Sequence, residues 1–553
     1  VSNIIHADKI KNNGASFIAS AMYDKKEFFA AKDAWCRPVQ MYIGPDGALY
    51  VIDYYRKIIE HPEWLSEEVI KSGELYKGSD KGRIYRITPA NKTEVNKFMA
   101  LPPANASTAE LVQMLASKNI WWRRTAQRLL MDKKDTAAVS LLQSMADTVS
   151  NAVAAVHALW ILDGYKALDA STLIKALHHN SEGVRENAIK IAEKYLHQFP
   201  KLEQQLISLQ NDVSEKVRFR LLCTLGEIKT ITATNAMQRI FIKDIEDRWV
   251  QVAALGAFTG NEMKLLEECI ALFGTQPSEG KALFFANCAG VIGLSQRQND
   301  IKKIIALSTA KKTNAGWWQS ACLKGLEQAF AVKGIPAGAE EEKNMLLSQF
   351  TAEADAGVRS AALELLGVLG TPAKEINAVL VKARAILNDN NEDADLKKDA
   401  LQLVAIGGEK TDTAIVAGVV TNTNVPAELR QSAIHALNKI APQQCNNTII
   451  AQWSQLPVSV QDEGIKIFLS SIENMQVLLN AIENKIIQTS SISWPQKVEL
   501  MNNDDAAIRN RSRKLLAPEI ENREAVYKNY QAALTTKGDT AKGKLVFAKA
   551  CGT

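Results

Sequence analysis

One pattern constrains the fold of this chain more than any other. An apolar residue followed four positions later by a small one recurs along the middle of the sequence, and the copies at Val184, Val217 and Trp249 are 33 and 32 residues apart. Residues four apart lie on one face of a helix, and the small residue lets a neighbouring helix approach closely. A unit of this length suits a helix pair, which must stack on further pairs to bury its apolar face. The aligned pairs are Trp122/Ala126, Val184/Ala188, Val217/Leu221, Trp249/Ala253, Trp317/Ala321, Val358/Ala362, Leu396/Ala400, Leu429/Ala433 and Val460/Gly464.

The residues that flank these apolar positions favour helix starts. Glu182 and Glu215 stand two places before the apolar residue, and Arg185 and Arg218 come directly after it. Negative charge is stabilising at a helix N-terminus because free N–H groups and the helix dipole point there. We therefore predict a HEAT-like α-solenoid over residues 105–520. It should hold about ten helix pairs, with helix starts near residues 122, 184, 217, 249, 317, 358, 396, 429 and 460.

Residues 1–100 have the sequence pattern of short β-strands separated by turns. The runs at 38–43 and 48–53 are separated by Gly44-Pro45-Asp46-Gly47, which favours a tight turn and therefore a hairpin. A third short strand is predicted within residues 82–89. Three strands cannot bury a core alone, whereas the blades of a β-propeller lean on their neighbours. Residues 1–100 are therefore predicted to be the incomplete end of a propeller-like domain.

Composition narrows the classes of function. The chain has 66 basic and 61 acidic residues, a net charge of +5, which is far from the basic stripe of a nucleic-acid binder. Trp121-Trp122 followed by Arg123-Arg124 is compatible with a DNA-binding groove, but the favoured interpretation is that one tryptophan fills the inter-helix core and the other caps a neighbouring turn. The seven scattered cysteines form no zinc or disulfide pattern, and no run of 18 apolar residues exists. We expect no nucleic-acid partner and no membrane span.

The segment 535–553 carries a more specific signal. The spacing of Gly538, Asp539, Gly543, Phe547 and Cys551 resembles the opening helix of class I cytochromes c, where it leads into C-x-x-C-H. The resemblance implies that Cys551 forms a haem thioether in a longer protein and that haem c is the cofactor there. Because the second cysteine and the histidine are not in this sequence, we expect no haem on this chain by itself.

The β-rich segment also resembles a known family. Its motifs are similar to the end of the propeller in large bacterial membrane-bound dehydrogenases, whose propeller is related to soluble quinoprotein glucose/sorbosone dehydrogenases. Cys36 departs from that pattern, where an aromatic residue is more common. The resemblance implies a propeller, a HEAT-like solenoid and a c-type haem domain in that order. The motifs that carry it are Trp35–Val39, Gly44–Val51, Asp53–Arg56, His61–Trp64 and Lys81–Arg86.

The site residues in this segment are only weakly indicated. Arg37, Asp53 and Arg56 are weak candidates for catalysis because they flank strand ends, and Asp46 is a weak candidate for a calcium ligand. A turn-forming role is the favoured alternative for Asp46, and Asp53 with Arg56 can instead form an ion pair. The resemblance further implies pyrroloquinoline quinone (PQQ) or calcium in the propeller and a periplasmic or exported location.

Two functions remain open on the sequence alone. The expected fold is mainly α, a HEAT-like α-solenoid with an N-terminal β-propeller-blade remnant and a truncated cytochrome c helix. In the first interpretation, the solenoid joins a propeller that oxidises a sugar or alcohol to a haem that accepts the electrons. In the second, the chain is a non-catalytic scaffold whose solenoid binds a protein or a polysaccharide.

Overall fold

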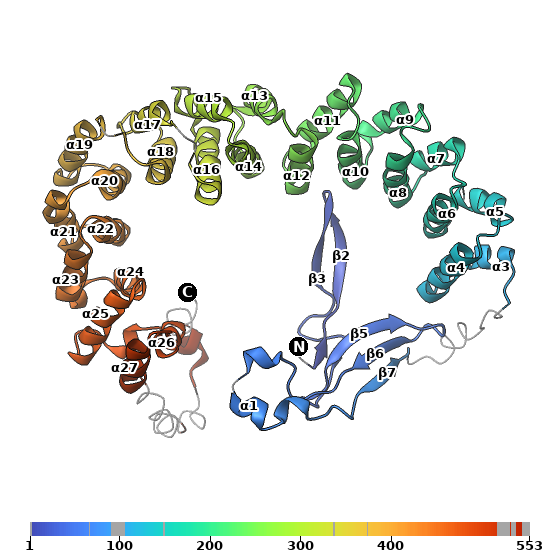
Figure 1. The fold of residues 1–553 in the computed structure, drawn as a ribbon, viewed down its shortest axis with the longest axis horizontal. Helices are drawn as coiled ribbons and strands as arrows, with labels where there is room; N and C mark the ends of the chain where they lie inside the picture. The colour runs from blue at the N-terminus through green and yellow to red at the C-terminus, as the bar shows by residue number, and fades with distance from the viewer. Residues whose placement is uncertain are drawn as a thin grey trace. The chain divides into compact units, whose positions relative to one another are not determined.

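A computed structural model describes residues 3–65, 67–89, 105–147, 150–335, 338–372, 374–516, 531 and 538–544. The chain divides into two compact units, Val1–Phe284 and Phe285–Thr553. Both units contain rows of short helices, and the strands that the structure describes all lie in the first (Figure 1). The Cys551 position and the rest of the cytochrome-like run after Lys544 fall outside the described residues.

The first unit opens with three small antiparallel sheets. The three-stranded sheet has the order β5-β6-β7, and its strands lie at the three places that the sequence predicts. Two further pairs precede it, β1 with β4 and β2 with β3, and the second of these is a long hairpin that was not expected from the sequence. The bounds are β1 Ile4–Ile5, β2 Asp8–Asn13, β3 Ser16–Ala21, β4 Phe29–Ala30, β5 Pro38–Ile43, β6 Leu49–Asp53 and β7 Arg83–Ile87, with the short helix α1 at Glu67–Lys71.

The turn between β5 and β6 is fixed to the first long helix of the solenoid, α4 (Ile120–Lys133). The Asn119 side-chain amide donates to the carbonyl oxygens of Gly44 at 3.0 Å and Pro45 at 3.1 Å. The indole N–H of Trp122 donates to the same Pro45 oxygen at 3.0 Å. These bonds satisfy the Pro45 carbonyl, add a second donor to the Gly44 carbonyl, which already accepts from the Gly47 N–H, and set the end of the sheet against α4.

In the first unit the helices form two rows (Figure 1). The even row consists of α4, α6, α8, α10 and α12, each in contact with the next, and the odd row consists of α3, α5, α7, α9 and α11. This is the stacked helix-pair architecture of a HEAT-like solenoid, so the predicted fold class is confirmed. The remaining bounds are α3 Thr108–Met114, α5 Ala138–Ala146, α6 Ala152–Tyr165, α7 Ala170–Leu177, α8 Glu182–Ala192, α9 Leu202–Ser208, α10 Glu215–Leu225, α11 Ile231–Lys243, α12 Arg248–Ala257 and α13 Glu262–Phe273.

The second unit repeats the arrangement. The even-numbered helices α16 to α24 again contact one another in sequence, and odd-numbered helices pack beside them. The bounds are α15 Gln298–Thr309, α16 Gly316–Lys333, α17 Glu340–Leu347, α18 Ala356–Leu369, α19 Ile376–Asn388, α20 Ala394–Gly407, α21 Thr413–Thr421, α22 Ala427–Ile440, α23 Pro442–Gln452, α24 Val458–Leu469, α25 Ile472–Glu483, α26 Trp494–Met501 and α27 Ala506–Leu516, while α14 (Glu279–Ser295) contains the boundary between the units.

Each helix start named from the sequence lies within two residues of an observed one. The reason is a fixed geometry, in which the third residue of each of these helices except α4 is an apolar one that points into the core. Two of the aligned residues were wrong by one position. Trp249 is 42% exposed while Val250 is fully buried, and Trp317 is only half-buried while Trp318 is buried. With Val250 in register, the spacing becomes 33 residues at both steps. Helices such as α6 and α14 were not identified from the pattern.

In most of these helices, and in α27, the fourth residue is a side-chain donor that closes the preceding loop. Arg185 donates to the carbonyl oxygens of His179 and Asn180, at 2.8 and 3.0 Å. Glutamine takes the same role in α12, where Gln251 donates to the Ile245 oxygen at 2.7 Å. Such a donor satisfies carbonyls that would otherwise be buried without a partner. The residues with this role are Arg123, Arg185, Arg218, Gln251, Gln319, Arg359, Arg430, Gln461 and Arg509.

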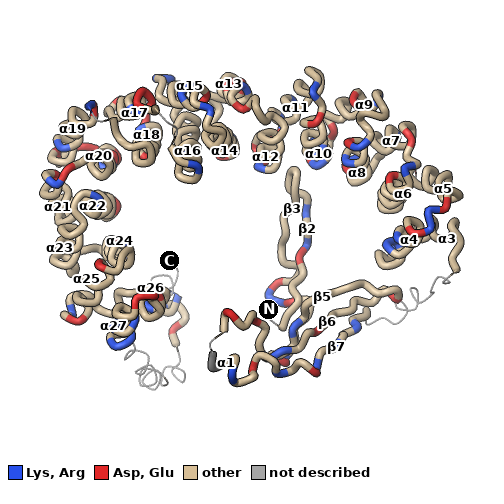
Figure 2. Tube along the Cα trace, in the orientation of Figure 1, with Lys and Arg blue, Asp and Glu red and all other residues tan. Residues whose placement is uncertain are grey.

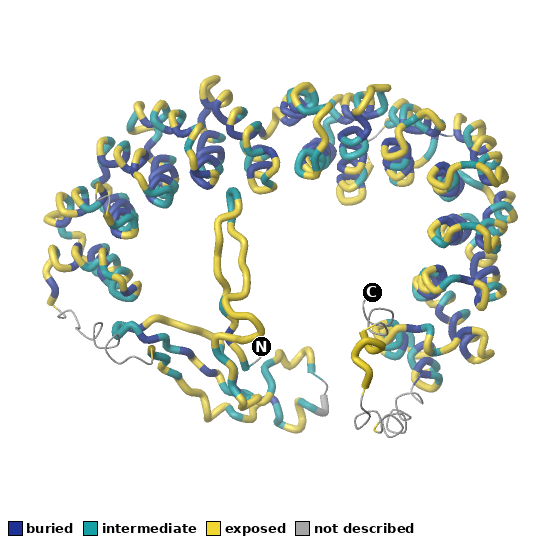
Figure 3. Tube along the Cα trace, turned by 180° about the vertical axis from the view of Figure 1, so that it is seen from behind, coloured by how far each residue is buried: buried dark blue, intermediate teal, exposed yellow. Residues whose placement is uncertain are grey.

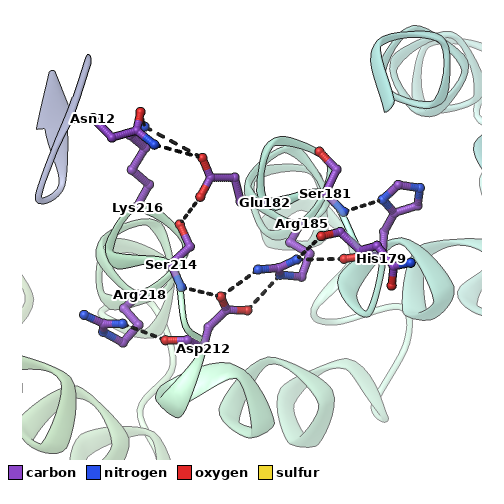
Figure 4. A network of polar contacts seen from close by, with 10 residues as sticks. Asn12, His179, Ser181, Glu182, Arg185, Asp212, Ser214, Lys216 and Arg218 are labelled. Atoms are coloured by element: carbon purple, nitrogen blue, oxygen red, sulfur yellow. Dashed lines mark hydrogen bonds and ion pairs between the residues drawn. The ribbon is translucent and has the colours of Figure 1, made fainter. Parts of the chain in front are cut away.

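In three repeats this arginine also pairs with a carboxylate of the following repeat. Arg185 binds both oxygens of Asp212 at 2.7 Å (Figure 4). Arg218 binds those of Asp244 at 2.7 and 2.6 Å. Arg359 binds Asp399 in the second unit in the same way through one oxygen. Among the helices that the structure describes, none combines the length and apolarity needed to cross a bilayer.

Candidate functional site

The β2–β3 hairpin contacts the even row of the first unit through its tip. Its arms are exposed to solvent, whereas Gly14, Ala15 and Ser16 at the tip are half-buried against the helices (Figure 3). A two-residue turn at Gly14-Ala15 links the strands, with Asn13 paired to Ser16. A free hairpin of this length is marginally stable in water, so the contacts at its tip decide where it lies.

The first group of contacts comes from α8 and α10. Lys216, only 8% exposed, donates to the side-chain oxygen of Asn12, and the Asn12 amide donates to Glu182 at 3.4 Å (Figure 4). The Lys216 ammonium also lies 3.9 Å from the centroid of the Phe17 ring. Ser214 donates to the other Glu182 oxygen at 2.7 Å. One buried cation thus binds both strands of the hairpin, by a charge-assisted hydrogen bond and by a cation–π contact.

The second group comes from the start of α12. Asp247 caps this helix by accepting from the backbone N–H of Trp249 at 2.7 Å, and its other oxygen accepts from the N–H of Ala15 at 2.7 Å. The approach is so close that a Cβ on Gly14 would lie 2.1 Å from that carboxylate oxygen. Gly14 also has a φ of +59°, a region that favours glycine. A helix cap therefore serves as a receptor for backbone of another segment.

A groove opens beside the tip. It has a volume of about 770 Å³ and is lined by the hairpin tip and by the starts of α12 and α14. Phe17, Trp249 and Leu283 expose apolar surface into it, and Glu246 and Glu279 place carboxylates at its rim. Arg248 also lines the groove, with its guanidinium 4.7 Å from the centroid of the Trp249 ring. The volume falls within the range typical of ligand sites, and the groove pairs an apolar floor with acidic edges.

Arg37, Asp53 and Arg56, the candidates for catalysis, make hydrogen bonds to nearby residues of the sheet segment in the described region. Asp53, 1% exposed, accepts from the N–H groups of Arg37 at 2.7 Å and Tyr55 at 2.9 Å, and from the Tyr85 hydroxyl at 3.2 Å. The Arg37 guanidinium donates to the Lys57 carbonyl. Arg56 donates to three backbone carbonyls, of Tyr54, Tyr55 and Gly78. Asp53 therefore organises the end of β6, and its nearby arginine is Arg83 at 3.8 Å rather than Arg56.

Asp46 occupies the β5–β6 turn. Its carboxylate accepts from the Ala48 N–H at 3.1 Å, the Tyr50 hydroxyl at 3.1 Å and the Arg86 guanidinium at 2.7 Å. Burial alone would raise the pKa of Asp46, but these hydrogen bonds hold it below its usual value. A carboxylate already shared by a guanidinium and two other donors fits a calcium ligand poorly. In the described ranges no group of three or more His, Cys, Asp or Glu residues is placed to hold a metal ion.

Comparison with known proteins identifies a match over the β-rich segment. Residues 1–91 match the model of a domain of unknown function (DUF7133), a span that ends four residues after β7. No curated protein matches the chain.

Among solved structures, the chain is similar to Kap121p bound to Pho4p, with 13% identity over 77% of this chain and 52% of that one and a TM-score of 0.41. It is also similar to the karyopherin Kap121p bound to the extreme C-terminus of the protein phosphatase Cdc14p, with 13% identity over 80% and 54% and a TM-score of 0.43. The chain spans about half the length of these structures.

The hairpin and its receptor residues were not found from the sequence, although one signal was present. A two-residue loop with glycine at its first position, as at Gly14-Ala15, is a common hairpin turn. Nothing in the sequence pattern connects Asn12 to Lys216, because the two are 204 residues apart. Contacts at such separation depend on how the repeats stack.

Proposed function

We propose that the chain is a scaffold protein whose even helix row binds polypeptide, and that the groove beside the hairpin tip is a docking site for a partner. The observation that carries the proposal is the docked hairpin itself. The row α8, α10 and α12 already binds an extended segment of its own chain through Lys216, Glu182 and Asp247. The contacts use a buried cation, a carboxylate and a helix cap, which are general receptors for peptide groups.

The chemistry of the groove indicates the kind of segment. Phe17, Trp249 and Leu283 suit an apolar side chain, whereas Glu246 and Glu279 suit lysine or arginine. The Glu246 side chain is 57% exposed and bonds to Ser278 at 2.7 Å, with Lys281 at 3.8 Å. A segment with alternating apolar and basic residues fits both features. The acidic rim disfavours nucleic acid, whose phosphates it would repel.

Fluorescence anisotropy with the full chain tests this proposal. The probe is a labelled nonapeptide that alternates lysine and leucine, and its counterpart carries glutamate in place of lysine. We expect Glu279→Lys and Trp249→Ala each to weaken binding of the lysine peptide at least tenfold. Glu364→Lys makes the same charge change on the exposed face of α18 and should leave affinity within twofold. Equal affinity for all three variants would refute the assignment.

A second function rests on different residues. We propose that the chain also belongs to a haem-linked dehydrogenase, periplasmic or exported, whose propeller oxidises a sugar or alcohol. Two observations favour it, namely the antiparallel order β5-β6-β7, as in the inner part of a propeller blade, and the run that ends in Cys551. Asp539 caps the helix that begins this run by accepting from the N–H groups of Ala541 and Lys542, at 3.0 and 3.1 Å. Cys551 would hold haem c, which would accept the electrons.

Reading the gene on either side of this chain tests the second function. The two codons after Thr553 should encode cysteine and histidine, and the sequence before Val1 should contain further strand-rich blades. Any other pair of codons after Thr553 removes the haem assignment. The scaffold proposal is independent of that result, because it rests on the groove and the hairpin.

A further inference from the structure

A second cleft lies where the three-stranded sheet meets the solenoid. It has a volume of about 340 Å³, with the end of β5 on one side and α4 on the other. Tyr42 and Ile43 from the strand and Ile120 and Trp121 from the helix supply its apolar lining. Tyr42 is 54% exposed. Exposed apolar side chains gathered in a concavity are a mark of binding surfaces.

The cleft is preformed by contacts within the chain itself. The Asn119 and Trp122 hydrogen bonds to the β5–β6 turn hold the strand end against α4. The Trp121 ring is fixed in turn by edge-to-face packing on Trp122, with ring centroids 4.4 Å apart. A preformed site binds without first losing conformational freedom.

Two guanidinium groups complete the cleft. Arg124 and Arg128 line it, are exposed, and stand one helical turn apart on α4 (Figure 2 shows the basic residues of this helix). Side chains at this spacing lie about 5–6 Å apart on the same helix face. Neither guanidinium makes an ion pair or a hydrogen bond with any residue that the structure describes, whereas Arg123 donates to the carbonyls of Ser117 and Lys118. The cleft therefore offers unneutralised positive charge beside an apolar wall.

We propose that this cleft binds an acidic segment of a partner protein, with an apolar or aromatic side chain against Tyr42 and Trp121 and carboxylates on Arg124 and Arg128. Polypeptide is the occupant because β5 is an edge strand of the order β5-β6-β7 and has no strand beside its outer edge among the described residues. Its free backbone groups can pair with an extended peptide. Two free arginines in a chain of net charge +5 are too few for a nucleic-acid track.

The test uses the full chain and a defined probe. A fluorescein-labelled dodecapeptide of aspartate and glutamate with one central phenylalanine should bind with a Kd in the micromolar range at low salt. Arg124→Glu combined with Arg128→Glu should weaken this binding at least tenfold, and Tyr42→Ser should weaken it several-fold. All three side chains are exposed, so the variants should fold.

A matched control is available on another helix. Arg239 and Lys243 form an exposed basic pair with the same spacing on α11, so Arg239→Glu with Lys243→Glu makes the same charge change. It should leave affinity for the acidic probe within twofold. Glu279→Lys at the other groove should also leave it unchanged, which separates this proposal from the scaffold site described above.

Three outcomes would overturn the assignment. Unchanged affinity in the Arg124 and Arg128 double variant would remove the role of the guanidinium groups. Tighter binding of a single-stranded oligonucleotide of equal charge, lost in the same variant, would assign the cleft to nucleic acid. Displacement of the probe by inorganic phosphate at millimolar concentration, together with equal binding of a probe that lacks phenylalanine, would reduce the cleft to a simple anion site.

Discussion

The arginine at the fourth position of α10 offers a sharp test of how the repeats hold together. Arg218 is 3% exposed and donates three hydrogen bonds, two to Asp244 at 2.7 and 2.6 Å and one to the Asp212 carbonyl at 2.6 Å. The hydrogen bond from Arg218 to Asp244 raises the pKa of Arg218 above its usual value. Arg218→Met keeps an unbranched side chain that can fill much of the same space and removes every donor. It leaves Asp244 largely buried without its cation.

Removal of one partner of a buried ion pair costs about 3–5 kcal/mol, chiefly because the other charge stays desolvated. Since about 1.4 kcal/mol is a factor of ten, opening of α10 should become more frequent by about two to three and a half powers of ten. Hydrogen exchange of the α10 and α11 amides measures this directly. A global melt is less informative, because long repeat arrays depart from two-state unfolding.

Two further variants decide the cause. Arg218→Met with Asp244→Leu removes both charges and should recover most of the loss, as replacement of a buried pair by apolar groups is close to neutral. Arg239→Met, an exposed arginine with one hydrogen bond to Gln210 at 3.1 Å, should change exchange by less than about 0.5 kcal/mol. If Arg218→Met matches Arg239→Met, or if the double variant is worse than the single one, the reasoning is wrong.

Other predictions concern the hairpin, pH and thiol reactivity. Gly14→Ala should detach the hairpin tip and speed amide exchange at residues 14–17 at least tenfold, whereas Gly73→Ala, at a φ of +70° with open space around it, should leave that segment unchanged. The hydrogen bond from Arg384 lowers the pKa of Asp412. The Arg384–Asp412 pair therefore stabilises the folded state fully above about pH 4, the ordinary carboxyl pKa, and this stabilisation is lost as the pH falls through the folded-state pKa of Asp412. Thermal melts from pH 6 to 3 should show this dependence, and Arg384→Leu should reduce it; an unchanged slope would contradict it. Burial raises the pKa of Cys322 to about 12, so native Cys322 should resist iodoacetamide at pH 8 and react only after denaturation.

Periodicity predicted the repeat because the physical cause is local. Val184, Val217 and Val358 each stand third in their helices and point into the core, so their spacing in the sequence reflects the repeat length. The same reasoning failed by one residue at Trp249 and Trp317. In both cases a large aromatic residue precedes the core position and was aligned in its place, although the next residue, Val250 or Trp318, is the buried one.

The candidate sites were less accessible to sequence reasoning. The glycine-first loop Gly14-Ala15 is typical of a hairpin, yet the docking of this hairpin on Lys216 depends on the stacking of repeats far along the chain. Trp121 and Trp122 illustrate the same limit. The sequence predicted that one would cap a neighbouring turn and the other fill the core. Trp122 does donate to the Pro45 carbonyl in the β5–β6 turn, but Trp121 lines a cleft instead of filling the core. Burial and pairing of an individual side chain are set by neighbours that periodicity does not specify.

The arginine–aspartate pairs give the repeat array a polarity that matters for dissecting it. Arg185 depends on Asp212 and Arg218 on Asp244, so each repeat takes its counter-charge from the one that comes after it. A fragment that stops after α8 or α10 would leave a guanidinium without its carboxylate partner at the new C-terminal end. By contrast, Gln461 in α24 is uncharged and donates to the carbonyl of Trp453, which precedes it in the sequence. Gln461 therefore needs no carboxylate from a later repeat. Fragments for expression should therefore end after a repeat such as that of α24, and those cut after α8 or α10 should aggregate or fray from their C-terminal side.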